Sequence, residues 1–404
     1  MASERRYYDD GYTSAFTARV SATGTWQERP ALELEETWFY PESGGQLGDQ
    51  GTIGGATIVD VQADDDGRVW HVLSNAGPEG PLSAQINSPL PAQLNFARRF
   101  DHMQQHTGQH VLSAAFERVL GATTLSSTLG EERSVIELAT PGFDWRQSGE
   151  VETAANALLW EDRPIQLHWT DSEGVQRFAL RKPPKVEGRI RIVEIPDWDL
   201  SACGGTHTRR TGEVGVLKIV GWEKVRGNVR VAFLCGGRAL RDHAWRTEAL
   251  LESAKRRTLK DRDLIAHLER AAEERDELAK RLHTLESRLL AEAAVRRVGD
   301  PPAGVAELAD ERSREDVRAF ALACLSAGAP WVVSAARGPE PALVVARAKS
   351  QSGDMRTLLP TLLELSGGRG GGSPDMVQLS AAGAAQAEAA YNRAAAAMPE
   401  LTGG

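Results

Sequence analysis

The stretch PAQLNFARRFDHMQQHTGQHVLSAAFERVLG, Pro91 to Gly121, decides how the rest of the chain is interpreted. Its apolar residues recur with helical spacing and Gly121 is a typical C-cap, so we predict one long helix. His102, His106 and His110 fall on one face of that helix, each four residues from the next. Neighbouring imidazoles in this row can bind one transition-metal ion, but His102 and His110 lie too far apart to share it.

A pair of histidines rarely forms a tight metal site alone, so a second ligand pair is expected elsewhere. The motif CGGTH at Cys203–His207 has the same four-residue spacing, and its glycines favour a tight turn or a helix start. A thiolate with imidazoles suits Zn²⁺, while the absence of a carboxylate from both motifs disfavours Mg²⁺ and Ca²⁺. HTGQH lacks the glutamate of HExxH, which disfavours a zincin-type protease. We therefore predict zinc as cofactor, in a structural or a catalytic role, held by His106, His110, Cys203 and His207.

The segments on either side of the helix predict an α+β protein of several domains. Residues 1–92 alternate apolar and polar side chains around a glycine-rich loop, which indicates a small β-barrel or sheet. Residues 93–237 mix helices with strands and contain both ligand motifs, so we expect a mixed α+β domain. Residues 299–404 contain strand patterns, a glycine loop at 366–378 and an alanine-rich helical tail, which indicates a small α/β domain.

Residues 238–298 contain no glycine or proline and predict a long, continuous helix. An imperfect heptad seam runs along it, which is typical of a coiled coil. The seam needs a partner, either a second chain or a helix folding back; we expect a homodimer formed through 238–298. Its positions are Leu264, Leu268, Ala271, Arg275, Leu278, Leu282, Leu285 and Leu289.

Composition limits the class and the location of the protein. The chain has 404 residues with a net charge of −9, which taken alone argues mildly against nucleic acid. Residues 177–230 nevertheless contain twelve Lys and Arg against six Asp and Glu, which leaves room for a basic face. No apolar stretch reaches 18 residues, so we expect no membrane partner. Three cysteines are too few for a disulfide framework, which favours a cytoplasmic location.

Four motifs together resemble one family. Beside the two ligand pairs, FYPESGGQLGDQG at Phe39–Gly51 looks like a glycine-rich segment of that family, and GGRGGGSPDMVQ at Gly367–Gln378 looks like its DHHA1 glycine motif. In this order they resemble the trans-acting alanyl-tRNA editing proteins of the AlaX type, in their long form. Those proteins are freestanding relatives of the editing domain of alanyl-tRNA synthetase, and the aminoacylation domain has no counterpart in this chain.

The resemblance implies hydrolysis of mischarged tRNA(Ala), mainly Ser-tRNA(Ala) with Gly-tRNA(Ala) as a further candidate substrate. A site that hydrogen-bonds the serine hydroxyl would reject alanine by leaving polar groups unpaired. Candidate polar residues for such a site are Gln46, Thr107, Gln109 and Thr206, although Thr107 and Gln109 are equally compatible with the helix surface. Candidate tRNA contacts, from the basic segment and the DHHA1-like motif, are Arg181, Lys182, Lys185, Arg209, Arg210 and Arg369.

Several alternatives stay open at this point. A zinc-stabilised RNA-binding protein without activity would carry the same motifs. So would an editing enzyme for another tRNA, such as Ser-tRNA(Thr), because the threonyl-tRNA synthetase editing domain shares the histidine and cysteine motifs. A metal-dependent hydrolase of small esters is the third alternative. The glycines at 44–48 and 367–372 are compatible with turns or with close approach to RNA.

Overall fold

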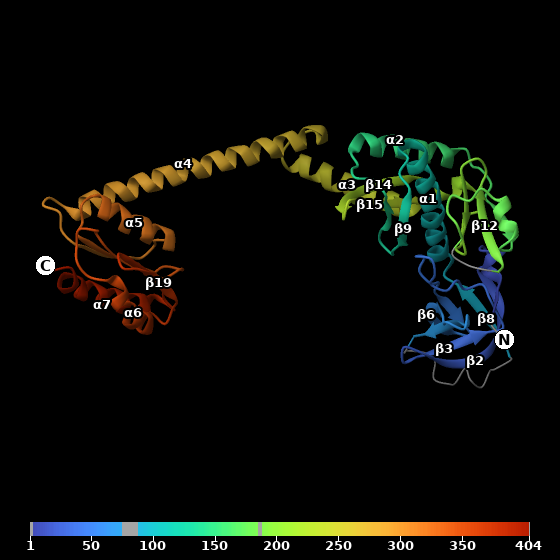
Figure 1. Ribbon diagram of the computed structural model, residues 1–404, viewed down its shortest axis with the longest axis horizontal. Coiled ribbons are helices and arrows are strands. Elements are labelled where there is room, and N and C mark those ends of the chain that lie inside the picture. Colours follow the sequence, from blue (N-terminus) through green and yellow to red (C-terminus); the bar gives the residue numbers. More distant parts are fainter. Residues whose placement is uncertain (1–2, 75–87, 185–187, 404) are drawn as a thin grey trace. The chain divides into compact units, whose positions relative to one another are not determined.

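The computed structural model describes residues 3–74, 88–184 and 188–403. The chain divides into two compact units, Met1–Ser253 and Ala254–Gly404, and each combines helices with β-sheet (Figure 1). The predicted α+β class is therefore confirmed. Within the described residues, no helix combines the length and the apolar character that crossing a membrane requires.

Six strands near the N-terminus pair in a ring, in the order β2-β3-β7-β6-β5-β8, and β8 pairs again with β2. Alternate side chains of these strands point inward and form a core that includes Val20, Leu34, Ile58 and Val61. The strands predicted for residues 1–92 thus form a ring-like sheet. Its strands are β2 (Ala15–Trp26), β3 (Arg29–Leu34), β5 (Gly51–Ile53), β6 (Ala56–Ala63), β7 (Val69–Leu73) and β8 (Pro89–Leu94), and β1 (Glu4–Arg5) pairs with β4 (Glu36–Thr37) beside them.

The long helix α1 (Phe96–Leu120) follows the last strand of the ring. Its predicted start at Pro91 was wrong, because β8 pairs with β2 and β5 up to Leu94 and Asn95 then caps the helix by accepting from the backbone N–H of Arg98. Its predicted end is confirmed, since Gly121 adopts a left-handed conformation with φ 64°. The middle of α1 is buried, which places the histidine row inside the unit.

Two antiparallel sheets and a second helix surround α1. One sheet has the order β14-β15-β10-β9 and the other has the order β11-β12-β13. Gly108 allows α1 to approach the first sheet closely, because a Cβ at this position would lie 2.2 Å from Sγ of Cys235. The elements are β9 (Thr124–Leu129), β10 (Ser134–Leu138), α2 (Trp145–Trp160), β11 (Gln166–Thr170), β12 (Ile190–Ile195), β13 (Asp199–Ala202), β14 (Leu217–Val225) and β15 (Asn228–Cys235).

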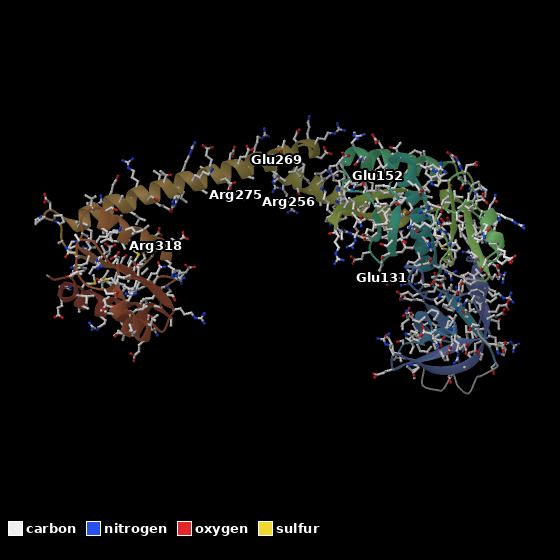
Figure 2. The ribbon with its side chains drawn as sticks, in the orientation of Figure 1. Glu131, Glu152, Arg256, Glu269, Arg275 and Arg318 are labelled. Atoms are coloured by element: carbon white, nitrogen blue, oxygen red, sulfur yellow. The ribbon has the colours of Figure 1, made fainter. Side chains whose placement is uncertain are left out.

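The long helix predicted over 238–298 is interrupted. Helix α3 spans Gly236–Arg256 and α4 spans Leu264–Val298, with a short 3-10 turn at Asp261–Asp263 between them. The break occurs at Thr258, whose φ of 56° is incompatible with a right-handed helix. Leu264 at the start of α4 is buried, but the other seam leucines along the helix stay exposed, from 42% at Leu268 to 62% at Leu289. Charged side chains such as Glu269 and Arg275 also project from this helix (Figure 2).

The second unit contains a five-stranded sheet in the order β16-β17-β18-β20-β19. Helices α4 and α5 pack on one face and α6 and α7 on the other (Figure 1). The predicted glycine loop at 366–378 is in part strand, because Gly370–Ser373 pairs with β20 at the edge of the sheet. The elements are β16 (Val305–Ala309), α5 (Arg314–Ser326), β17 (Trp331–Ala336), β18 (Ala342–Arg347), α6 (Leu359–Ser366), β19 (Gly370–Ser373), β20 (Met376–Ser380) and α7 (Ala384–Thr402).

Candidate metal centre

The fold brings the two ligand motifs together. Helix α1 supplies His106 and His110, and the loop after β13 supplies Cys203 and His207. The potential ligand atoms of these four residues all lie within 4.8 Å of one another. Sγ of Cys203 lies 3.3 Å from Nε2 of His106 and 3.3 Å from Nε2 of His207. One sulfur and three imidazoles in this arrangement can hold a metal ion.

Each imidazole is oriented by a partner on its Nδ1 atom. Gln46 Oε1 lies 2.7 Å from Nδ1 of His106, and Asp199 Oδ2 lies 2.7 Å from Nδ1 of His110. Thr107 Oγ1 lies 3.2 Å from Nδ1 of His207. Because all three Nδ1 atoms are occupied, the Nε2 atoms remain for the centre of the cluster. Histidine ligands of metals are typically held in this way by a second group.

The glycine-rich segment of the ring-like sheet delivers Gln46 to the cluster. Gln46 is fully buried, and its Nε2 donates to Oγ1 of Thr206 at 2.8 Å while its Oε1 accepts from the backbone N–H of Thr206 at 3.1 Å. The same side chain therefore joins His106 to the loop that carries Cys203 and His207. Gly45 adopts φ +86°, and a Cβ there would lie 2.8 Å from the carbonyl oxygen of Ser127, so glycine is required on both grounds.

The CGGTH loop fits tightly over α1. A Cβ on Gly205 would lie 2.0 Å from Cε1 of His106, whereas a Cβ on Gly204 would make only ordinary contacts with Tyr8. Arg191 of β12 holds the loop, since its Nη1 donates to the carbonyl oxygens of Cys203 at 3.0 Å and Gly205 at 2.8 Å. The CGGTH motif therefore forms a turn that is fixed both by Arg191 and by its close contact with His106.

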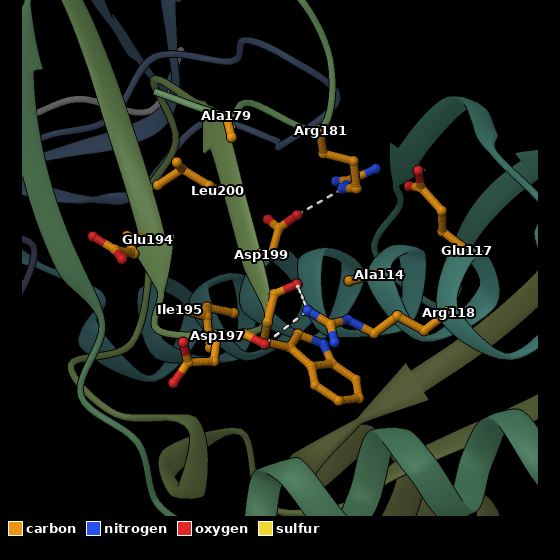
Figure 3. A pocket seen from close by; sticks show the side chains of 11 residues that line it. Ala114, Glu117, Arg118, Ala179, Arg181, Glu194, Ile195, Asp197, Asp199 and Leu200 are labelled. Atoms are coloured by element: carbon orange, nitrogen blue, oxygen red, sulfur yellow. Dashed lines mark hydrogen bonds and ion pairs between the residues drawn. The ribbon is translucent and has the colours of Figure 1, made fainter. Parts of the chain in front are cut away.

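Asp199 connects the cluster to a surface hollow. Its Oδ1 accepts from Nε of Arg181 at 2.6 Å, and Ser201 Oγ lies 3.0 Å from its Oδ2. Asp199 and Arg181 line a pocket of about 450 Å³, whose wall also includes Arg118 and Trp198 (Figure 3). In this view the Asp199 carboxylate points toward Arg181, so the guanidinium balances the charge of a carboxylate that is 5% exposed.

The electrostatics of the cluster favour a thiolate. Burial alone raises the pKa of the Cys203 thiol, but the imidazoles of His106 and His207 outweigh burial and hold that pKa well below its ordinary value. Burial, together with the nearby His106, lowers the pKa of His207 to about 3. At His110 burial also acts to lower the pKa, but the hydrogen bond to Asp199 and the nearby Cys203 raise it to about 9. A metal ion binds thiolate and unprotonated ring nitrogen, so it would compete with a proton at His110.

The other predicted polar residues lie in different surroundings. Thr107 is buried, and besides facing His207 it accepts from the backbone N–H of Thr208 at 3.1 Å. Gln109 is also buried but donates to Ser113 Oγ at 2.8 Å, along the helix and not into the cluster. The surface alternative for these two residues was therefore wrong. His102 lies outside the cluster, and burial together with Arg98 and Arg238 lowers its pKa to about 4.

The predicted basic contacts are scattered over the described residues. Arg181 is largely buried in its ion pair with Asp199, and Lys182 is exposed. Arg209 is exposed and stacks over the ring of Tyr12 at 3.9 Å, next to a hollow of about 120 Å³ that reaches His207. Arg210 is exposed and pairs with Asp162 at 2.6 Å. Arg369 is exposed in the second unit, and Lys185 lies outside the described residues.

Two residues that hold the cluster were not predicted from the sequence. The sequence did contain an indication of Asp199. In the strand DLSA, side chains alternate between faces, so Asp199 and Ser201 lie on one face just before Cys203. Arg191 gave no such signal, since its role depends on the carbonyl oxygens of a turn that the sequence does not define.

Comparison with known proteins supports the same family. Residues 190–231 match the model of the threonyl and alanyl tRNA synthetase second additional domain. The chain is 27% identical to alanyl-tRNA editing protein AlaX-L of Pyrococcus horikoshii, over 93% of this chain and 94% of that protein. It is 36% identical to mouse alanyl-tRNA editing protein Aarsd1 over 52% of this chain, and 34% identical to the alanine–tRNA ligase of Methanopyrus kandleri over 76% of it. It spans only 50% of the mouse protein and 35% of the ligase.

Proposed function

Because the chain is an AlaX-like relative of the alanyl-tRNA editing proteins, we propose that it hydrolyses the ester bond of mischarged tRNA(Ala) in trans. The proposed substrates are Ser-tRNA(Ala) and Gly-tRNA(Ala). The observation that carries the proposal is the set of three buried histidines and one half-buried cysteine at the junction of α1 and the CGGTH loop. The reaction is carboxylic ester hydrolysis, and the enzyme is an aminoacyl-tRNA hydrolase.

We propose zinc as the ion that His106, His110, Cys203 and His207 hold. The fit rests on the donor set, one thiolate with three imidazoles, and on the partner that occupies Nδ1 of each ring. When bound, zinc supplies a charge that polarises an oxygen, lowers the pKa of water or orients the substrate. The protein's own part is to keep the ligand rings fixed and the thiol deprotonated.

Selection against alanine is proposed to depend on polar groups near the cluster. Gln46, Thr107 and Thr206 are buried beside the ligand rings and already hydrogen-bonded to them or to one another. The hydroxyl of serine would gain a hydrogen bond from this network, and the methyl group of alanine would not. Gln109 donates to Ser113 along the helix and not toward the ligand rings, so any effect of Gln109 on the substrate would be indirect.

The proposed contacts with tRNA come from exposed basic side chains. Lys182, Arg209 and Arg210 lie in the first unit, and Arg209 borders the hollow that reaches His207. Arg369 is the proposed contact in the second unit. Side chains of this kind bind phosphate groups and therefore give an affinity that falls with salt. Lys185 remains a prediction from the sequence.

We also propose that two chains pair through α4. Its seam leucines Leu278, Leu282 and Leu285 are each more than half exposed, and no described residue of the chain covers them. A second copy of the same helix offers the matching heptad. Replacing Leu278 and Leu285 with glutamate should convert a dimer, measured by light scattering, into a monomer. A wild-type monomer at micromolar concentration would contradict this proposal.

Editing of a threonine tRNA is the second candidate function. The matched model covers the threonyl as well as the alanyl synthetase domain, so Ser-tRNA(Thr) is included in the test. The experiment measures hydrolysis of Ser-tRNA(Ala), Gly-tRNA(Ala), Ala-tRNA(Ala) and Ser-tRNA(Thr) side by side. The proposal expects rapid loss of serine from tRNA(Ala) with alanine retained. Stable Ser-tRNA(Ala) in the presence of RNA binding would instead support a non-catalytic RNA-binding protein.

A further inference from the structure

A small hollow lies beside His207, between the N-terminal segment of the chain and the edge strand β11. It has a volume of about 120 Å³, and its walls include the rings of Tyr8 and Tyr12 and the side chain of Leu167 from β11. Two arginines and two aspartates also line it, so its net charge is +2 − 2 = 0. We call it the N-terminal hollow; its charged residues are Asp9, Asp10, Arg191 and Arg209.

Two of these four charges are occupied by contacts within the protein. Asp10 accepts from Oγ1 of Thr13 at 2.5 Å and from the backbone N–H of Tyr12 at 2.9 Å. Arg209 lies 3.9 Å from the Asp10 carboxylate and stacks over the ring of Tyr12. Because Asp10 and Arg209 balance each other, Asp9 and Arg191 are the charges that remain for a ligand.

Arg191 is a buried cation whose hydrogen-bonding capacity is only partly used. It is 6% exposed, and its Nε and Nη1 donate to the backbone carbonyl oxygens of Tyr8, Cys203 and Gly205. A guanidinium group carries five N–H groups, so these three bonds leave both hydrogens of Nη2. Within the described part of the chain, Nη2 has no acceptor and the guanidinium has no carboxylate partner. Since buried charges are normally paired, the hollow is suited to an anionic group that reaches Nη2.

Asp9 supplies an unpaired negative charge at the same hollow. Asp9 is exposed, and its carboxylate takes part in no ion pair and no hydrogen bond with any described residue. Burial lowers the pKa of Arg191, and nearby groups that include Cys203 and Asp9 act in the opposite direction. The two charges are therefore close to one another without pairing, which leaves space for a ligand between them. A phosphate group fits this space poorly, because Asp9 would repel its second negative charge.

We propose that the N-terminal hollow binds a free α-amino acid with a small side chain, through its carboxylate at Arg191 and its ammonium group at Asp9. The volume corresponds to about four water molecules, which is enough for glycine, alanine or serine and too little for a nucleotide. An aminoacyl ester has no carboxylate charge to pair with Arg191, so the ligand is the free acid. The choice of serine, released beside His207, rests on the proposed function; the zwitterion chemistry of the hollow does not.

Calorimetric titration of the full chain with L-serine tests the hollow in the absence of tRNA. We expect saturable binding of one serine per chain. Serinamide lacks the carboxylate and 3-hydroxypropionate lacks the ammonium group, so each should bind about tenfold more weakly than serine. L-Phenylalanine should not bind, because its ring exceeds the volume of the hollow. Absence of saturable binding at millimolar serine, or equal affinity for serine and serinamide, would overturn the inference.

Asp9→Asn tests the ammonium contact at a residue outside the ligand cluster and its supporting groups. The variant keeps the shape and removes the charge, so the Kd for serine should rise about tenfold while the Kd for 3-hydroxypropionate does not rise. The charge-matched control is Asp65→Asn, in an exposed turn between β6 and β7, which should leave both constants unchanged. An unchanged Kd for serine in Asp9→Asn would place serine elsewhere and overturn the inference.

The two proposals fail in different ways. If Ser-tRNA(Ala) is not hydrolysed but serine binding still depends on Asp9, the proposed function fails and this inference stands. If Ser-tRNA(Ala) is hydrolysed and serine binding does not depend on Asp9, the proposed function stands and this inference fails.

Discussion

Nδ1 of His110 lies 2.7 Å from the buried Oδ2 of Asp199. The carboxylate is held in turn by Arg181 on its other oxygen, at 2.6 Å. These two contacts place the proton of His110 on Nδ1 and turn its Nε2 toward the other ligand atoms. Arg181, which the sequence predicted to contact tRNA, therefore also supports the candidate metal centre through Asp199.

Asp199→Asn should lower metal affinity. The amide cannot supply the negative charge that orients and polarises the imidazole, and loss of such a partner typically reduces affinity about 10- to 100-fold. The measurement is the zinc dissociation constant, obtained by competition with a chelator. Asp197→Asn is the control, because Asp197 is exposed and its φ of 58° suits asparagine. Equal affinities in both variants would remove Asp199 from the account.

Gly205→Ala should abolish metal binding while Gly204→Ala preserves it. The methyl group at 205 would lie 2.0 Å from the His106 ring, whereas at 204 its nearest atom is Tyr8 Cε1 at 3.6 Å. The ring or the loop must move in the first variant, which takes the ligand atoms out of bonding reach. Zinc per chain, measured by mass spectrometry on both purified variants, checks this difference. Full zinc content in Gly205→Ala would show that the loop can shift away from His106 without losing the ion.

Arg99→Ala should destabilise the first unit strongly. Arg99 is fully buried and paired with Asp49, and its Nη1 also donates to the carbonyl oxygen of Gly11 at 2.7 Å. Removing one member of a buried pair costs about 3–5 kcal/mol. Urea denaturation provides the measurement. The neighbouring Arg98→Ala breaks a pair with the exposed Glu131 and should cost clearly less than Arg99→Ala, about 1 kcal/mol. Equal losses in the two variants would contradict this ranking.

Stability should fall as pH drops from about 6.5 to 4, in part because of His71. Burial lowers the pKa of His71 to about 4, against 6.5 as its ordinary value, so the unfolded chain takes up a proton first. The contribution of His71 is present above pH 6.5 and is lost as pH falls toward 4; at about 1.4 kcal/mol per pKa unit it amounts to roughly 3 kcal/mol. His71→Gln should show a shallower fall over this window. An identical slope in wild type and variant would exclude His71 as a source.

The sequence predicted the elements that follow from local periodicity and missed those that depend on distant partners. Helix α1 and its Gly121 cap were visible in the apolar spacing, but the strand at Pro89–Leu94 was not, because its pairing with β2 and β5 is long-range. The break at Thr258 carried no glycine or proline to announce it. The strand at Gly370–Ser373 was hidden because glycine has no strand propensity.

The sequence predicted which four residues form the candidate metal site, but it did not predict how other side chains hold them in place. Equal spacing in HTGQH and CGGTH identified the four residues, since side-chain chemistry and periodicity are local properties. The supporting roles of Gln46, Asp199 and Arg191 required knowledge of which segments meet. Arg181 has a structural role that a count of basic residues does not reveal, because it pairs with Asp199 at 2.6 Å; its contact with tRNA stays a prediction.

The most direct measurement is hydrolysis of Ser-tRNA(Ala) by wild-type protein and by Cys203→Ala, each with its zinc content determined. We expect wild type to contain about one zinc ion per chain and to release serine, because a site of one thiolate and three imidazoles holds one ion. Cys203→Ala should lose the ion and the activity together. Wild-type turnover by a Cys203→Ala protein that contains no metal would contradict the account.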